Sequence, residues 1–289
     1  SKQHLILGGG EKFLHPNVDP SLLSGIMLNP MQQSEPSKIA LFSGAQYSWK
    51  QWKSEEEAKK INDIAFNFVE NGHFEDSKVS AAFRELGKHM INQNMDNRVV
   101  KLEESVDLAP KLTYFMTKLK AGQDVTAERA ALRAEFAKIK EAAELYKASG
   151  DKKMVAQIHY WLDNAIDQMN ALDAFLTGTE AMDTNDAAKL WDSYYKGLKL
   201  YEQSQTHTFH YVDHLEKAEL GVQHIRPFIL SLKEVLASEV QKVLHPDQII
   251  STFITNRTGV EGGLAEVADG DLATHAIIKS PNSIKTGDY

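Results

Sequence analysis

Asn29 is the residue whose position most suggests a contact with a ligand. It follows the short apolar stretch 24–28 and precedes Pro30. The stretch can form a buried strand that Pro30 ends, because proline cannot donate a hydrogen bond to a neighbouring strand. Ser34-Glu35-Pro36-Ser37 then has the composition of a helix start. Polar side chains at the carboxyl end of a strand contact ligands in many α/β proteins, although an Asn-Pro pair is also typical of a simple turn.

The acidic residues do not form an obvious catalytic pair. No two aspartates are adjacent anywhere in the sequence, and the nearest neighbouring acids are Glu75 and Asp76. The run Glu55-Glu56-Glu57 falls where a helix is expected to begin, and carboxylates there favour the helix dipole. We therefore expect these acids to cap helices or to face solvent.

Three histidines at helical spacing raise the question of a metal site. His207, His210 and His214 would share one face of a helix, and three imidazoles can bind a metal ion. However, the segment 203–209 lacks the apolar stripe of a buried helix. We therefore predict no metal site and no cofactor, and keep a structural metal at these histidines as the alternative.

Composition limits the possible classes of function. The chain has 289 residues, a net charge of −8 and no cysteine. Nucleic acid is an unfavourable partner for such a charge, and disulfides and cysteine chemistry are impossible. No apolar run approaches the length of a membrane span, so none is predicted.

The middle of the chain, residues 53–245, has the pattern of an all-α bundle. Apolar residues recur at intervals of three and four, and capping residues and glycines separate the segments. The expected helices cover 54–71, 78–93, 105–122, 126–149, 151–178, a segment capped by Thr184, and 222–243, where Pro227 marks a bend or a restart.

Aromatic residues in this bundle allow two interpretations. They could form a surface for stacking sugars, but at these spacings core and rim positions are more common. The residues are Trp161, Trp191, Tyr194, Tyr195 and Tyr201.

The N-terminal stretch contains several short motifs in a fixed order. They are Ser24-Gly25, Asn29-Pro30-Met31, Glu35, Ser37-Lys38-Ile39-Ala40 and Tyr47-Ser48-Trp49. In these motifs the stretch resembles the segment that closes the catalytic barrel of glycoside hydrolase family 84, a group of β-N-acetylglucosaminidases, O-GlcNAcases and bacterial hyaluronidases. His4-Leu5-Ile6-Leu7-Gly8 is also similar to a motif of this family, although Gly9 stands where the family usually has proline.

This resemblance implies that Asn29 hydrogen-bonds hydroxyls of a bound N-acetylglucosamine. The family's two adjacent catalytic aspartates have no counterpart here, so we expect the chain to be a piece of a longer enzyme and inactive alone. The whole enzyme would be a retaining hydrolase that uses the substrate's acetamido group as nucleophile.

Two later stretches extend the resemblance. Residues 223–229 are similar to a motif in the helical domain that follows the family's barrel. Beyond Pro246 the residues resemble the opening of a discoidin-type domain, the fold of family 32 carbohydrate-binding modules, through Asp269, Gly270, Thr274 and Gly287-Asp288-Tyr289. About forty residues cannot complete such a sandwich.

The expected fold is therefore mainly α, a helical bundle preceded by the last strand–helix unit of a (β/α)8 barrel and followed by a short β-rich tail. We predict three parts, residues 1–52, 53–245 and 246–289. The expected function is the non-catalytic C-terminal region of a secreted, extracellular β-N-acetylglucosaminidase or hyaluronidase whose partner is a glycan with terminal N-acetylglucosamine. The alternative is a helical spacer or protein-interaction module.

Overall fold

The computed structural model describes residues 5–8, 18–90, 103–244, 260–261 and 277–278. The described part is mainly helical, as predicted. Most of the segment expected to open a discoidin-type domain lies outside the described residues, which contain there only the paired strands β3 (Val260–Glu261) and β4 (Ile277–Ile278).

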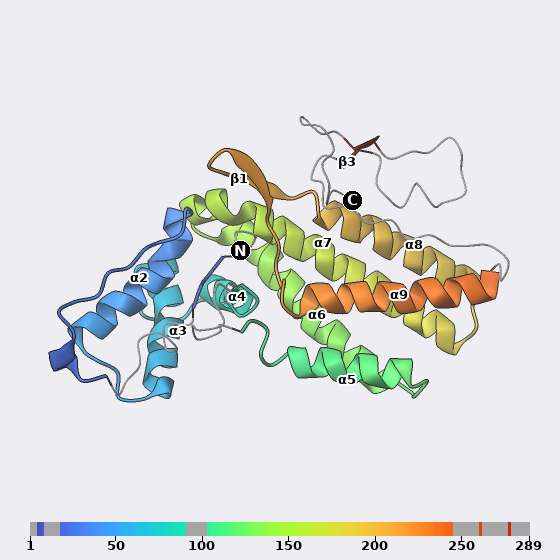
Figure 1. Cartoon of the computed structure of the whole chain (residues 1–289), viewed down its shortest axis with the longest axis horizontal. Helices are drawn as coiled ribbons and strands as arrows, with labels where there is room; N and C mark the ends of the chain where they lie inside the picture. The colour runs from blue at the N-terminus through green and yellow to red at the C-terminus, as the bar shows by residue number, and fades with distance from the viewer. Residues whose placement is uncertain (1–4, 9–17, 91–102, 245–259, 262–276, 279–289) are drawn as a thin grey trace.

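The α-helices carry the labels of Figure 1. They are α2 (Ser34–Trp49), α3 (Glu55–Asn71), α4 (Lys78–Gly87), α5 (Ala109–Lys120), α6 (Thr126–Ser149), α7 (Lys152–Asp183), α8 (Ala187–Ser204) and α9 (Ile225–Leu244). A short 3-10 helix, η1 (Pro20–Leu22), precedes α2. An antiparallel hairpin of β1 (Thr208–Tyr211) and β2 (His214–Lys217) separates α8 from α9.

The described helices form an elongated molecule with two regions (Figure 1). At one end α2 packs on α3, and α3 on α4. In the other region α6 and α8 pack along the long helix α7, and α9 packs on α7, α8 and α5. Contacts of α4 with α6 and of α2 with α7 join the two regions, and the β1–β2 hairpin lies near the junction.

One continuous apolar core runs through both regions. It includes Phe66 and Phe83 between α3 and α4, and Trp161 and Phe175 on α7. Leu5 and Leu7 are also buried in it, although their segment is not a strand. Because burial of apolar surface is the main favourable term in folding, this shared core holds the helices in a fixed arrangement.

Local signals set most helix boundaries as the sequence predicted. Ser54 accepts a hydrogen bond from the Glu57 amide at the start of α3, and Gly72 ends that helix with a φ of 73°. In the left-handed region glycine has no steric cost, which makes it the common residue after a helix. The predicted helix at 126–149 agrees with α6, and Asp151 caps α7 with bonds to the amides of Lys153 and Met154.

Two predictions about α7 and α8 were wrong. Helix α7 does not end at Gly178 but continues to Asp183. Gly178 instead allows close packing, because a Cβ there would lie 3.1 Å from a methyl carbon of Leu236 on α9. Thr184 follows the end of α7, whereas Asp186 caps α8 by accepting from the Lys189 amide.

Two further helix predictions needed adjustment. Helix α4 ends at Gly87, short of the predicted residue 93, and residues 91–93 lie outside the described part. Pro227 lies in the first turn of α9, so it marks a helix start and not a bend. Proline is tolerated in a first turn because the amides there have no partner within the helix. None of the described helices combines the length and the apolar composition that a membrane span needs.

Candidate functional site

Asn29 lies in an extended connection between η1 and α2. Asn29 is exposed, so a ligand can reach it. The predicted strand at 24–28 is absent in the structure. A strand needs a hydrogen-bonded neighbour, and the described strands pair only as β1–β2 and β3–β4, so residues 24–28 run alone along α2. Leu28 still packs against this helix, close to Gly44.

The residues after Asn29 are held by a buried serine. The Oγ of Ser37, which is 2% exposed, accepts a hydrogen bond from the Met31 amide at 3.0 Å and donates to the Gln33 carbonyl at 2.7 Å. The Met31 sulfur in turn accepts from the Ile6 amide at 3.2 Å. Ser37 therefore ties the connection to the first turn of α2, which gives this position of the motif a structural role.

The start of α2 is also bound to the helical bundle. The side chain of Gln157 on α7 accepts from the Glu35 amide at 2.9 Å and donates to the Ser34 hydroxyl at 3.0 Å. Glu35 and Lys38 form an ion pair one turn apart on α2. The position of Asn29 relative to α7 is thus fixed through the helix that follows it.

The three histidines do not share a helix face, because their segment forms the β1–β2 hairpin. His207 precedes β1 and pairs with Asp167 of α7 at 2.7 Å. His210 lies in β1 opposite Leu215, and His214 starts β2 between the carboxylates of Asp213 and Glu216. Among the described residues no three acidic or histidine side chains come close enough to hold a metal ion.

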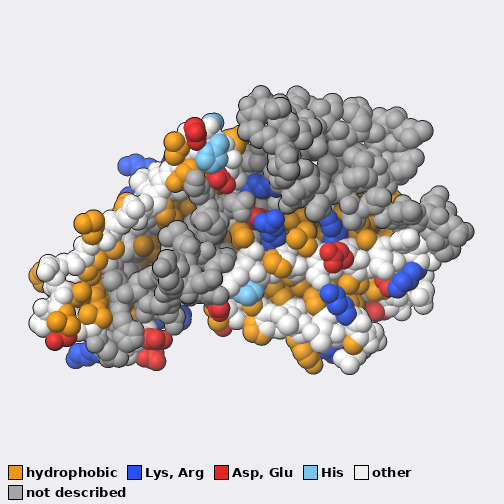
Figure 2. Space-filling model, in the orientation of Figure 1, with side chains coloured by type: hydrophobic (Ala, Val, Ile, Leu, Met, Phe, Trp, Pro, Cys, Tyr) orange, Lys and Arg blue, Asp and Glu red, His pale blue; other side chains and the backbone are white. Residues whose placement is uncertain are grey.

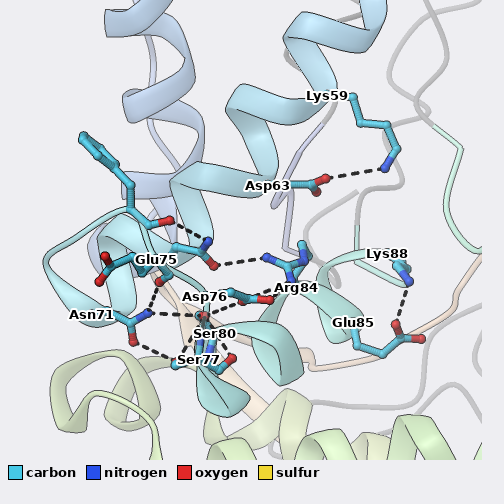
Figure 3. Close-up of polar contacts among 12 residues, drawn as sticks. Lys59, Asp63, Asn71, Glu75, Asp76, Ser77, Ser80, Arg84, Glu85 and Lys88 are labelled. Atoms are coloured by element: carbon cyan, nitrogen blue, oxygen red, sulfur yellow. Dashed lines mark hydrogen bonds and ion pairs between the residues drawn. The ribbon is translucent and has the colours of Figure 1, made fainter.

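The adjacent acids Glu75 and Asp76 belong to a polar cluster at the turn between α3 and α4 (Figure 3). Arg84 on α4 donates to Asp76 at 3.0 Å and to Asn67 on α3 at 3.1 Å. Ser77 and Ser80 form a capping box at the start of α4. Burial opposes ionisation of Asp76, but hydrogen bonds from Arg84 and Ser80 outweigh it and lower its pKa. The cluster fixes a turn and leaves no free carboxylate pair for catalysis.

A second polar group was missed from the sequence because Ser105 follows His89 by 16 residues, a separation that no helical or strand spacing connects. The His89 Nδ1 is 2.8 Å from the Ser105 hydroxyl, and its Nε2 is 3.9 Å from a carboxylate oxygen of Glu85. Serine, histidine and glutamate could form a nucleophilic triad. However, His89 and Ser105 are 4% and 2% exposed, so a substrate cannot reach them, and the group instead fixes the chain before α5 against α4.

A buried carboxylate at the start of α9 was also missed. One oxygen of Glu104 accepts from the amides of Gln223 and His224. Burial, together with the negative charge of Glu219, raises the pKa of Glu104 to about 7 despite these amides. Glu104 therefore joins the segment before α5 to the start of α9.

The aromatic residues considered as a sugar-stacking surface are mostly core residues. Trp161, Tyr194 and Tyr201 are buried. Trp191 and Tyr195 are half-buried on α8, with nearly parallel rings whose centroids are 5.8 Å apart. The arrangement thus favours packing over a broad binding surface.

Two separate segments of the chain match known protein families. Residues 1–88 match the family model described as beta-N-acetylglucosaminidase, and residues 107–208 match the one described as hyaluronidase post-catalytic domain-like. The solved structure of CpGH84D is similar, with a TM-score of 0.74 and 24% identity, over 82% of this chain and 38% of that chain. CpGH84B gives a TM-score of 0.65 and 20% identity, over 80% of this chain and 37% of that chain.

The fold and the second family match define a mainly helical post-catalytic domain. The two matched segments and the fold shared with CpGH84D together support a C-terminal region of glycoside hydrolase family 84, including the post-catalytic domain. The chain spans 38% and 37% of the two solved relatives.

Proposed function

We propose that this chain is the non-catalytic C-terminal region of a secreted exo-β-N-acetylglucosaminidase. The complete protein removes β-linked N-acetylglucosamine by retaining hydrolysis in which the substrate's own acetamido group is the nucleophile. The observation that carries the proposal is the match of residues 1–88 to a β-N-acetylglucosaminidase in a sequence that has no adjacent aspartate pair. The catalytic acids therefore come from elsewhere in the complete protein.

In this proposal Asn29 contacts the sugar. A carboxamide has an acceptor oxygen and a donor nitrogen, so it can bind two hydroxyl groups of a sugar at once. Its exposure and its anchored neighbours, Met31 and the start of α2, support this role. The physiological partner is a glycan with terminal N-acetylglucosamine.

The test compares hydrolysis of a chromogenic aryl β-N-acetylglucosaminide by this chain and by the complete gene product. We expect activity only in the complete protein. There, Asn29→Ala should lower kcat/KM by about tenfold or more, because each of the two lost hydrogen bonds is worth about 0.5–1.5 kcal/mol. Gln123→Ala, which removes an exposed amide from the turn between α5 and α6, is the matched control and should have no effect.

The other outcomes separate the parts of the proposal. Activity of this chain alone would overturn its non-catalytic role, and equal activity of Asn29→Ala and Gln123→Ala would overturn the role of Asn29. Detection of the complete protein only inside the cells that make it would contradict secretion.

A second candidate is a helical spacer or protein-interaction module. It is favoured by the second matched segment, which covers much of a bundle that shares one large core and needs no ligand to account for its packing. Absence of activity in both proteins would favour this candidate over the enzyme.

A further inference from the structure

The β1–β2 hairpin touches the connection that carries Asn29. The side-chain amide of Gln32 donates to the main-chain carbonyl of His210 at 2.7 Å, although these residues are 178 positions apart. Gln32 is three residues from Asn29, so their Cα atoms are at most about 11 Å apart. The hairpin therefore contacts the connection that carries the residue that the proposed function assigns to the sugar.

The base of the hairpin is fixed on the bundle. His207 pairs with Asp167 of α7 at 2.7 Å, and the Ala218 amide donates to the His207 carbonyl at 2.9 Å. Phe209 is 6% exposed, and its ring lies 4.6 Å from that of Trp161 on α7. Since Gln157 of the same helix holds the start of α2, α7 positions both the hairpin and the Asn29 connection.

The end of the hairpin presents groups that suit a sugar. Val212 has a φ of 55° and is 83% exposed at the turn. The rings of Tyr211 and His214 lie 5.8 Å apart, and the His214 side chain is 46% exposed. Asp213 and Glu216 are each 2.9 Å from an imidazole nitrogen and raise the pKa of His214 through hydrogen bonds. Histidine and acidic side chains gather on this part of the surface (Figure 2).

We propose that Tyr211 and the carboxylates held by His214 bind the unit to which the terminal N-acetylglucosamine is attached, and that this unit is a neutral sugar. The inference rests on the proposed function, because it extends the site marked by Asn29. An aromatic ring can cover the apolar face of a pyranose, and the carboxylates of Asp213 and Glu216, which His214 holds in place, can accept hydrogen bonds from its hydroxyl groups. A uronic acid fits less well because its carboxylate would approach Asp213 and Glu216, and like charges repel.

The experiment uses the complete gene product and three substrates with poor leaving groups. They are methyl β-N-acetylglucosaminide, a disaccharide of β-N-acetylglucosamine on galactose, and the corresponding disaccharide on glucuronate. Tyr211→Ala and His214→Ala should each lower kcat/KM for the galactose disaccharide about tenfold and leave that for the methyl glycoside unchanged. The wild type should prefer galactose to glucuronate.

Exposed residues elsewhere provide matched controls. Tyr114→Ala on α5 and His73→Ala after α3 remove the same side chains far from the hairpin in sequence, and should change none of the rates. His214→Gln keeps hydrogen bonding without the imidazole and gives a second test if Tyr211→Ala does not fold. His214→Gln should also lower kcat/KM for the two disaccharides and leave kcat/KM for the methyl glycoside unchanged.

Each contrary outcome has a separate meaning. A wild type that cleaves none of the substrates overturns the proposed function, and this inference with it. Cleavage that the hairpin variants leave unchanged, or reduce equally for all three substrates, overturns this inference alone. A peptide carrying serine-linked N-acetylglucosamine is assayed as a fourth substrate. If the variants lose activity only on this peptide, the neutral-sugar assignment is wrong and the hairpin binds peptide.

Discussion

Single residues determine how closely the long helices approach one another. Gly197 on α8 faces the ring of Phe175 on α7, and a Cβ at this position would clash with that ring.

Asn164 on α7 joins two chain segments by donating to the Ser204 carbonyl at 2.8 Å and accepting from the Leu220 amide at 2.9 Å. Asn164 is fully buried, so each of these bonds satisfies a main-chain group that water cannot reach.

We predict that Gly197→Ala destabilises the chain by about 1–3 kcal/mol, the usual cost of overpacking a core. Alanine is the better helix former by about 1 kcal/mol, so a net loss would show that the clash dominates. The free energy of unfolding in urea measures the effect. Gly25→Ala is the control, because an added methyl there meets no atom within 4 Å. Equal stability of the two variants would contradict the prediction.

At the scale of elements, buried polar side chains join segments that are distant in sequence. Glu104 lies before α5 and binds amides at the start of α9. A carboxylate near a helix start is favoured by the helix dipole, but here burial and Glu219 have the larger effect. One carboxylate oxygen of Glu104 is buried with no hydrogen-bond partner in the described structure, so the ionised form is disfavoured. The strength of the contact therefore depends on pH.

We predict that this contact makes the chain less stable as the pH rises. The pKa of Glu104 is about 7 in the folded chain, above the ordinary value of 4.5 for a glutamate. Its contribution to stability is therefore fully present below pH 4.5, decreases as the pH rises through about 7, and is constant above that. Glu104→Gln should remove this dependence.

Unfolding in urea at pH 5 and at pH 8 measures the difference. The wild type should lose about 1–3 kcal/mol relative to Glu104→Gln between these two values. Glu103→Gln is the control, because this neighbouring acid is exposed. A parallel pH dependence of the wild type and Glu104→Gln would show that Glu104 does not titrate in this range.

At the scale of the whole molecule, the region of η1, α2 and α3 exposes large apolar side chains. Met27 is 97% exposed and Trp49 is 89% exposed, and Leu22 and Phe74 are also exposed. Apolar side chains appear at this end of the molecule in Figure 2. Extensive exposed apolar surface usually marks a place where another structure packs.

We predict that the isolated chain self-associates through this region. Its sedimentation coefficient should rise with concentration, and Met27→Ser together with Trp49→Ser should reduce the rise, because both changes remove exposed apolar area. Val212→Ser, at the exposed hairpin turn, is the control. A chain that is monomeric at all concentrations would contradict the prediction.

The sequence by itself determined the features that depend on neighbours along the chain. The apolar stripe of residues 126–149 and the Ser54 cap with Gly72 correctly predicted α6 and α3, because helix periodicity and capping are local properties. The family resemblance, which rests on short motifs, was confirmed by the two matched segments. The boundaries at residues 52 and 245 and the role of Asn29 stay predictions.

Only the tertiary structure decided the features that depend on distant partners. Gly178 was interpreted as a helix end, but Leu236 on α9 explains it as a point of close packing. The spacing of His207, His210 and His214 suggested a helix face, whereas the segment pairs with itself as a hairpin. The contact of Gln32 with His210 joins residues 178 positions apart. Such contacts follow from how the helices pack, which local sequence patterns do not encode.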